Sequence, residues 1–181
     1  MTFESGPANG RQGAAGRRLL LTLASLALAI PCVAQAQKTA ADTDRASDRI
    51  KQLIALYAAA VDAADVNLAS QVWDNSPDVS FIHPRGHEHG WEEVKNFYRN
   101  MMGAPFSERK LTVRDVTVHV YGDSAWAEFY WHFVAKLRSD GSTLVTDGRE
   151  TQIYRKVDAG RWALVHVHYS AMPVTGAGRG F

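Results

Sequence analysis

Histidine is the side chain in this sequence that titrates closest to neutral pH, which makes the histidines the first candidates for proton transfer. Seven of the 181 residues are histidine. His83 ends a short β-rich run, immediately before Pro84. An imidazole there can act as a general acid or base because histidine titrates close to neutral pH. A purely structural role at a strand end is the alternative, but His83 is the best single catalytic candidate.

Two histidine pairs raise the question of a metal site. His166 and His168 project to one side of a predicted strand, and His87 and His89 would do so if their segment were extended. Imidazoles two residues apart on a strand can jointly bind zinc. No carboxylate or third histidine lies at a diagnostic spacing, so we predict no metal. The simplest interpretation of residues 87–89 is a solvated turn.

Composition narrows the class of protein. The chain has 20 Lys+Arg against 19 Asp+Glu, a net charge of +1 and 46% hydrophobic residues, which indicates one soluble globular domain. Nucleic acid is not an expected partner, because it requires clustered positive charge. The only cysteine is Cys32. Disulfides and cysteine catalysis are therefore not expected in the domain that follows.

The first 36 residues have the composition of a signal peptide. Arg17 and Arg18 precede an uncharged run from Leu19 to Ile30, and Ala34-Gln35-Ala36 supplies small residues for cleavage. The apolar run of about 12 residues is short of the roughly 20 that a spanning helix needs. We predict cleavage after Ala36, a periplasmic or secreted protein, and no membrane association once the signal is removed.

The sequence also offers two alternative export signals, and it predicts the segments that flank the folded domain. Lipid attachment at Cys32 and twin-arginine export through Arg17-Arg18 are alternatives, although both match their patterns loosely. Small polar residues predict a flexible leader over 37–46. The Gly-rich end predicts a disordered tail over 174–181. Residues 47–173 then form the domain.

Hydrophobic spacing changes from helix-like to strand-like near Pro105. Apolar residues three and four apart predict helices at 50–64, 65–73 and 91–101, and a β-rich run predicts a short strand at 79–83. Runs rich in β-branched and aromatic residues predict four long strands joined by hairpin turns, at 111–120, 125–137, 143–157 and 161–172. We therefore predict an α+β fold in which a strongly curved antiparallel sheet wraps around three helices and leaves a cavity.

Residues 125–137 alternate between two faces. One face carries Ala125, Ala127, Phe129, Trp131 and Phe133, and we expect it to line the cavity. The other face, with Trp126, Tyr130 and His132, is too aromatic for open solvent. We expect a second subunit to cover it, which predicts a homodimer.

Two stretches of the chain resemble the SnoaL-like members of the nuclear transport factor 2-like superfamily. The first comprises Leu56-Tyr57 through Asp65, Phe81-Ile82-His83-Pro84, Gly90-Trp91 and Phe97-Tyr98, and is similar to ketosteroid isomerase and polyketide cyclase relatives. The second comprises Glu150-Thr151 and the closing run from Trp162 to Pro173. This run is similar to the association domain of calcium/calmodulin-dependent kinase II. The resemblance implies a cone-shaped fold, but the superfamily includes both enzymes and oligomerisation hubs, so fold does not select function.

The resemblance also implies roles for particular residues. Tyr57 falls where ketosteroid isomerases carry a tyrosine that donates to the substrate oxyanion, and His83 where they place an aspartate base. Gln152 falls at or next to the position of their second, protonated carboxyl donor, and is a weaker donor. Kinase association domains have arginines near the positions of Gln152 and Trp131. The pocket is therefore predicted to be more apolar than theirs.

Together these features predict an exported domain that binds a small, mostly apolar molecule in a conical cavity. The expected substrate-binding residues are Trp131, Phe129, Tyr57 and Tyr169. An enzymatic version uses His83 as the base, with Tyr57 and Gln152 stabilising an enolate-like oxyanion. The reaction would be a cofactor-independent isomerisation, dehydration or cyclisation. A non-catalytic oligomerisation module is the alternative, and a clamp by Arg149 on a ligand carboxylate is a further one.

Overall fold

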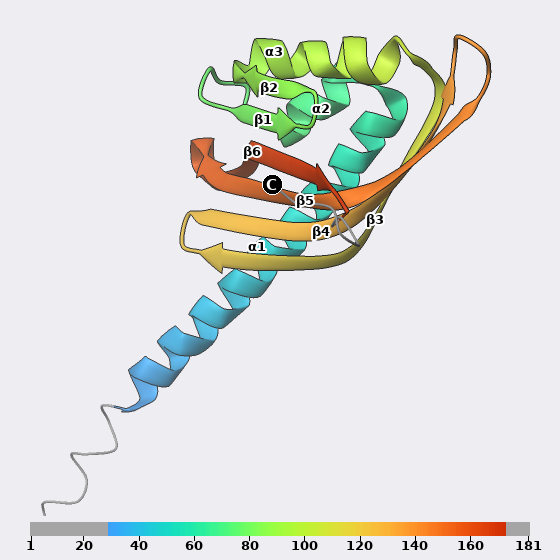
Figure 1. The fold of residues 1–181 in the computed structure, drawn as a ribbon. Helices are drawn as coiled ribbons and strands as arrows, with labels where there is room; N and C mark the ends of the chain where they lie inside the picture. Colours follow the sequence, from blue (N-terminus) through green and yellow to red (C-terminus); the bar gives the residue numbers. More distant parts are fainter. Residues whose placement is uncertain (1–28, 173–181) are drawn as a thin grey trace, which may run out of the picture. The chain divides into compact units, whose positions relative to one another are not determined.

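The computed structural model describes residues 29–172 (Figure 1). Most of the predicted signal peptide, residues 1–28, and the predicted tail lie outside the described residues. The chain divides into two units, residues 1–41 and 42–181, and the fold below is that of the second. Within residues 29–172, no helix is both long and apolar enough to cross a membrane.

The helices are α1 (Ala29–Ala63), α2 (Val66–Val72) and α3 (Gly90–Asn96), which continues as the π-helix η1 (Phe97–Gly103). The apolar stripe of α1 is buried as predicted, including Ile50, Leu53 and Tyr57. α1 also includes residues 37–46, for which the sequence predicts a leader. This segment contains neither proline nor glycine, so nothing in it interrupts a helix.

In the described part of the chain, six strands form one curved, open sheet. They are β1 (Ser80–His83), β2 (Gly86–His89), β3 (Phe106–Tyr121), β4 (Ser124–Leu137), β5 (Thr143–Val157) and β6 (Arg161–Ala171). A short 3-10 helix, η2 (Asp158–Gly160), joins β5 to β6. The strand order is β2-β1-β6-β5-β4-β3. Figure 1 shows the long strands bending together. The predicted α+β fold is confirmed.

The sheet differs from the prediction in two respects. It is mixed, because β1 pairs parallel to β6 while the other neighbours are antiparallel. The long chain between β1 and β6 permits this parallel pairing. Residues 86–89, predicted to lie in a turn, form β2, paired antiparallel with β1. β2 exists because β1 offers it hydrogen-bonding partners.

Asp62 and Arg109 fasten β3 to the end of α1. The Asp62 carboxylate accepts the Leu111 backbone N–H at 2.6 Å and pairs with Lys110 Nζ at 2.6 Å. The Arg109 guanidinium donates to the main-chain carbonyls of Asp62 at 2.9 Å and Met102 at 2.7 Å. These contacts fix the helical layer against the sheet, which sets the width of the space between them.

β3 is an edge strand with an irregularity near its middle. Its register against β4 shifts between Arg114 and Thr117, and Asp115 adopts a φ of 57°. A left-handed residue of this kind lets a strand bend sharply.

Candidate active site

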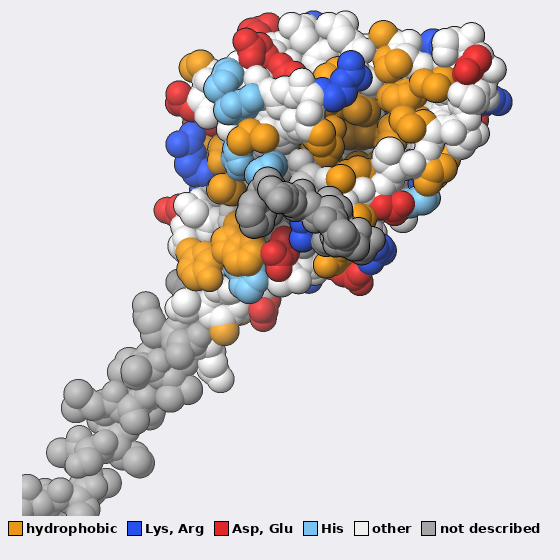
Figure 2. Space-filling model, viewed as in Figure 1, with side chains coloured by type: hydrophobic (Ala, Val, Ile, Leu, Met, Phe, Trp, Pro, Cys, Tyr) orange, Lys and Arg blue, Asp and Glu red, His pale blue; other side chains and the backbone are white. Residues whose placement is uncertain are grey.

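A cavity of about 420 Å³ lies between the helices and the inward face of the sheet. Small-molecule sites commonly have volumes of this order. Figure 2 shows hydrophobic side chains around a hollow, with a Lys or Arg side chain beside it. Most of the lining residues are apolar, and the polar or ionisable ones are Tyr57, Arg85, Thr146, Asp147, Glu150 and Tyr169.

Glu150 carries a carboxyl group into this apolar space. It lies on the inward face of β5 and is only 4% exposed. Burial raises its pKa to about 8, and hydrogen bonds from Gln152 and Tyr57 oppose part of that rise. The carboxyl is therefore mostly protonated at pH 7.

Gln152 and Tyr154 support Glu150 from behind the cavity wall. The three residues alternate along β5, so their side chains share one face. Gln152 Nε2 donates to Glu150 Oε1 at 2.7 Å, and the Tyr154 hydroxyl donates to Gln152 Oε1. Gln152 is fully buried and does not line the cavity. It holds the Glu150 carboxyl, which is the member of this group that lines the cavity.

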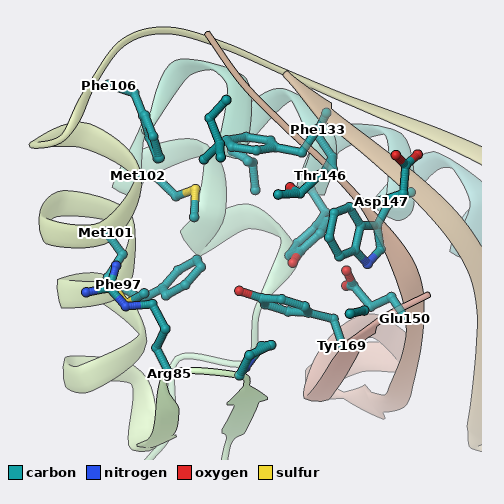
Figure 3. Close-up of a pocket in the computed structure, with 17 residues that line it drawn as sticks. Arg85, Phe97, Met101, Met102, Phe106, Phe133, Thr146, Asp147, Glu150 and Tyr169 are labelled. Carbon is teal, nitrogen blue, oxygen red and sulfur yellow. The ribbon is translucent and has the colours of Figure 1, made fainter. Parts of the chain in front are cut away.

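Two tyrosines face the cavity beside this carboxyl. Tyr57, on α1, is hydrogen-bonded to Glu150, and burial followed by the nearby carboxyl raises the Tyr57 pKa well above its ordinary value. Burial and Glu150 also raise the pKa of Tyr169 to about 12, although Arg85 opposes the rise. Figure 3 shows Tyr169 between Glu150 and Arg85. Both phenols therefore stay protonated and can donate hydrogen bonds.

Trp131 presents an unused donor. Within residues 29–172, its indole Nε1 is the one buried side-chain nitrogen or oxygen without a hydrogen-bond partner. Its ring meets Tyr169 edge-on at 5.6 Å and lines the cavity. Leaving a buried N–H unpaired is costly in a folded protein, so Trp131 is held in place by packing and not by a hydrogen bond from its indole.

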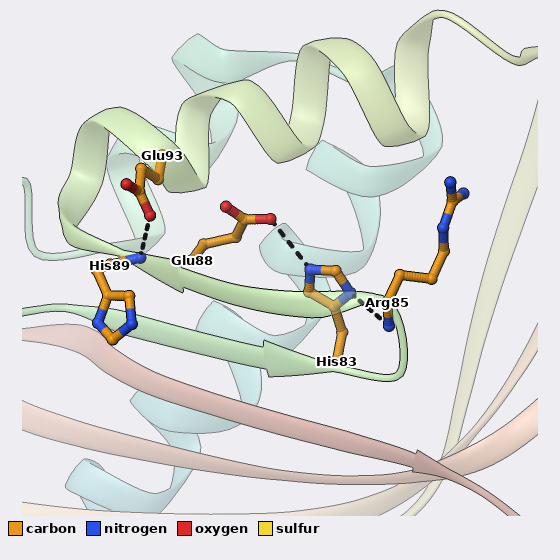
Figure 4. Close-up of polar contacts among 5 residues, drawn as sticks. All are labelled: His83, Arg85, Glu88, His89 and Glu93. Atoms are coloured by element: carbon orange, nitrogen blue, oxygen red, sulfur yellow. Dashed lines mark hydrogen bonds and ion pairs between the residues drawn. The ribbon is translucent and has the colours of Figure 1, made fainter.

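His83 lies beside the cavity and not on its wall. Its side chain is 1% exposed and its ring stacks on Tyr169 with a centroid distance of 6.0 Å. Nδ1 accepts the Arg85 backbone N–H at 3.3 Å, and Nε2 lies 3.1 Å from Glu88 Oε1 (Figure 4). Because Nδ1 accepts a hydrogen bond, the ring proton lies on Nε2. Both ring nitrogens are thus engaged within the protein.

Residues 50–175 match the family model of the SnoaL-like domain. The chain belongs to the SnoaL-like domain family. This SnoaL-like domain is 46% identical to a nuclear transport factor 2-like superfamily protein from Salmonella enterica serovar Typhimurium. That match covers 74% of this chain and 96% of the other, with a TM-score of 0.72. The predicted resemblance is confirmed, while no match is found among curated proteins.

More distant solved structures share the fold of this SnoaL-like domain. A proposed dehydratase of the same superfamily from Streptomyces avermitilis is 21% identical, with a TM-score of 0.63 and coverage of 71% of this chain and 98% of the other. The calcium/calmodulin-dependent kinase II hub of S. rosetta is 24% identical, with a TM-score of 0.58 and coverage of 68% and 95%. At these identities the likeness concerns the fold alone.

The SnoaL-like domain brings together only some of the site residues expected from sequence. Tyr57, Trp131 and Tyr169 line the cavity, and Phe129 is buried on the same face of β4 outside its lining. The alternation predicted for β4 is confirmed, because its expected cavity face is buried. The catalytic role of His83 stays a prediction.

The outer face of β4 is partly covered by side chains from the same chain. Trp126 stacks on His119 at 4.1 Å, and the Arg114 guanidinium lies 4.7 Å from the Tyr130 ring centre. His132 Nδ1 lies 2.9 Å from Asp147 Oδ1. A second subunit over this face stays a prediction.

Sequence reasoning missed the charged residues of the cavity wall, Glu150, Arg85 and Asp147. Glu150 lies opposite Phe129, a member of the predicted cavity face, in the pairing of β4 with β5. A correct prediction of that strand register would have placed Glu150 on the cavity face. Arg85 lies in the turn between β1 and β2, where no periodicity applies. Arg149, the suggested carboxylate clamp, is exposed on the opposite face of β5 and does not line the cavity.

Strand β1 brings the two histidine pairs onto one face of the sheet. His89 and His166 flank Ser80, while His87 and His168 flank Ile82. Ser80 Oγ lies 2.6 Å from His166 Nδ1, and partial burial, followed by the charges of His168 and His87, lowers the pKa of His166. Among residues 29–172, no group of three or more His, Cys, Asp or Glu is arranged to hold a metal.

Proposed function

We propose that this domain binds a small, mostly apolar carbonyl compound and transfers a proton on it, in a cofactor-independent isomerisation or dehydration. The observation that carries the proposal is Glu150, a carboxyl group in an apolar cavity with a pKa of about 8. Perturbed ionisable groups in clefts often mark catalytic sites. Such a pKa lets one group serve as both base and acid near neutral pH.

Glu150 can carry out either reaction alone. Its ionised form removes a proton from the carbon next to the substrate carbonyl, and the electron pair of that C–H bond moves into the carbonyl to give an enolate. In an isomerisation the substrate also has a β,γ double bond, so the proton returns to the γ-carbon while the double bond moves next to the re-formed carbonyl. In a dehydration it passes to a leaving β-hydroxyl, which departs as water. Both routes restore the starting carboxylate, so no external reactant is needed.

Tyr57 can stabilise the enolate. Its hydroxyl needs only to turn from Glu150 toward the substrate oxygen. Donors fixed in a site of low polarity stabilise developing negative charge more strongly than water does. This assignment keeps the predicted role of Tyr57, while Gln152 supports Glu150 from behind the cavity wall.

Deuterium exchange tests the proposal. The domain would be incubated in heavy water with a panel of apolar ketones and β-hydroxy carbonyl compounds, and proton NMR would follow exchange at the α-carbon. We expect exchange of at least one compound, lost in Glu150→Gln. The matched control is Glu128→Gln, which alters an exposed glutamate on β4. Equal exchange by wild type and Glu150→Gln would contradict the role of Glu150.

His83 as the base is the competing enzymatic proposal, and the same assay separates the two. Both ring nitrogens of His83 take part in hydrogen bonds, so His83 must break one of them before it can accept a proton. This favours Glu150 as the base. Loss of exchange in His83→Gln with full exchange in Glu150→Gln would favour His83.

Oligomerisation is a second candidate function. It is supported by the fold shared with association domains, including that of calcium/calmodulin-dependent kinase II from C. elegans, at 20% identity and a TM-score of 0.55. Tyr121, Val145 and Ile153 are large exposed hydrophobic residues that a second copy could cover. Light scattering of residues 37–181 at micromolar concentration tests this proposal, and a strict monomer would contradict it.

We also propose export to the periplasm or the medium, with cleavage after Ala36. Support comes from the sequence pattern of residues 1–36. Fractionation of expressing cells, followed by N-terminal sequencing of the product, tests both claims. A cytoplasmic protein that keeps Met1 would overturn them.

A further inference from the structure

The cavity wall carries one basic side chain, Arg85. The ionisable carboxyl and guanidinium groups of the wall belong to Arg85, Asp147 and Glu150. Asp147 is exposed and lies 2.9 Å from His132 on the neighbouring strand, and Glu150 is mostly neutral at pH 7. Within residues 29–172, the exposed Arg85 side chain has no ion pair or hydrogen bond, so its positive charge is open to a ligand.

Local contacts hold the turn that carries Arg85. The Arg85 backbone N–H donates to His83 Nδ1, and the other ring nitrogen of His83 is held by Glu88 on β2. Figure 4 shows these three residues bridging the β1–β2 hairpin. The His83 side chain is almost fully buried against Phe97 and Tyr169. These contacts hold the backbone of the turn at the cavity wall, and the exposed Arg85 side chain extends from it.

The Arg85 side chain lies apart from Glu150, the group proposed to transfer the proton. Figure 3 shows Tyr169 between Arg85 and Glu150, and the Tyr169 pKa responds to both residues in opposite directions. A ligand that reaches both would have an anionic end near Arg85 and its reactive carbonyl near Glu150. The apolar side chains between them would contact its body.

We propose that Arg85 binds the carboxylate of the substrate, so that the substrate class is an apolar carboxylic acid that also bears the reactive carbonyl. The assignment rests on the proposed function and names its substrate class. A guanidinium matches a carboxylate through two parallel hydrogen bonds. One unpaired arginine balances one negative charge, which favours a carboxylate over a phosphate dianion.

Two matched probes test this substrate class. Naphthylacetate and its neutral isostere naphthylacetamide differ in charge and little in shape. Calorimetric titration of the wild-type domain should give an affinity roughly tenfold or more higher for the carboxylate, the usual scale for a charged hydrogen-bonded pair. In Arg85→Gln that preference should vanish, while the affinity for the amide stays unchanged.

Arg149→Gln is the control, because it removes one exposed arginine from the opposite face of β5. It should keep the preference for the carboxylate. Thermal melting of Arg85→Gln checks that the exposed substitution leaves the fold intact. Equal binding of both probes by the wild type would overturn the proposal while leaving the proton-transfer function standing. Failure of both probes to bind would overturn the substrate class, and the deuterium-exchange assay would then decide the function separately.

Discussion

Trp131 on β4 lies directly opposite Gly148 on β5, and its indole ring occupies the space where a side chain at Gly148 would stand. A Cβ atom built on Gly148 would overlap both the Trp131 ring and the Ser170 carbonyl oxygen. Glycine is thus required at this strand position to let the indole lie against the sheet. The position of the Trp131 ring in the cavity wall depends on this packing.

Gly148→Ala should therefore displace Trp131 and lower the free energy of unfolding by about 1–3 kcal/mol, the usual cost of overpacking. Urea denaturation measures the loss. Gly86→Ala is the control, because its Cβ would meet only His83 atoms at an ordinary distance of 3.7 Å. Equal stability of the two variants would show that Trp131 does not need Gly148.

Glu150 should make stability depend on pH in a defined direction. Its folded-state pKa of about 8 exceeds the ordinary value of 4.5, so between these limits the native state holds the proton more tightly than the unfolded chain. The free energy of unfolding should fall as pH rises from about 4.5 to 8, by at most ~1.4 kcal/mol per pH unit from this group. Glu150→Gln should flatten that slope, while Glu128→Gln should keep it. Identical pH profiles for Glu150→Gln and wild type would contradict the burial of a protonated carboxyl.

Tyr57→Phe should raise the pKa of Glu150 further, because the Tyr57 hydrogen bond favours the ionised carboxyl. The midpoint of the pH-dependent loss of stability should move upward, and the variant should lose about 1 kcal/mol of stability. Tyr121→Phe, at an exposed tyrosine, serves as the control. A midpoint that stays in place would argue against the Tyr57–Glu150 bond.

His166 should make stability depend on pH in the opposite direction to Glu150. Its folded-state pKa lies below the ordinary 6.5, so the unfolded chain binds more protons as pH falls. Stability should decrease as pH drops from about 6.5 through the folded-state pKa. NMR titration should find the His166 pKa lowered, and closer to the ordinary value in His87→Gln, which removes a neighbouring imidazole. No difference between the two proteins would show that His87 does not affect it.

Periodicity was sufficient to predict most elements of this fold, but it failed where pairing decides the structure. β3 begins at Phe106, five residues before the predicted start, because Ser107 to Lys110 is polar and its strand conformation comes from pairing with β4. The short, histidine-rich β2 shows no strand alternation and depends on β1 in the same way.

The candidate site was harder to predict for a related reason. A glutamate on a strand is expected to face solvent, and Glu150 faces inward because the register with β4 places it opposite Phe129. Burial raises the pKa of Glu150, and that burial is a property of the assembled sheet and not of the local sequence. The resemblance pointed to the right strand but to Gln152, two residues further along the same face.

The irregularity in β3 also affects how copies of the protein meet. β3 is the long edge of the sheet, and an unpaired edge of this length could add strands from other molecules. The left-handed Asp115 and the register shift beside it break the regular row of free backbone groups, and charged Arg114 stands at the same point. An interrupted, charged edge of this kind pairs less readily with a strand of another molecule than a regular one does.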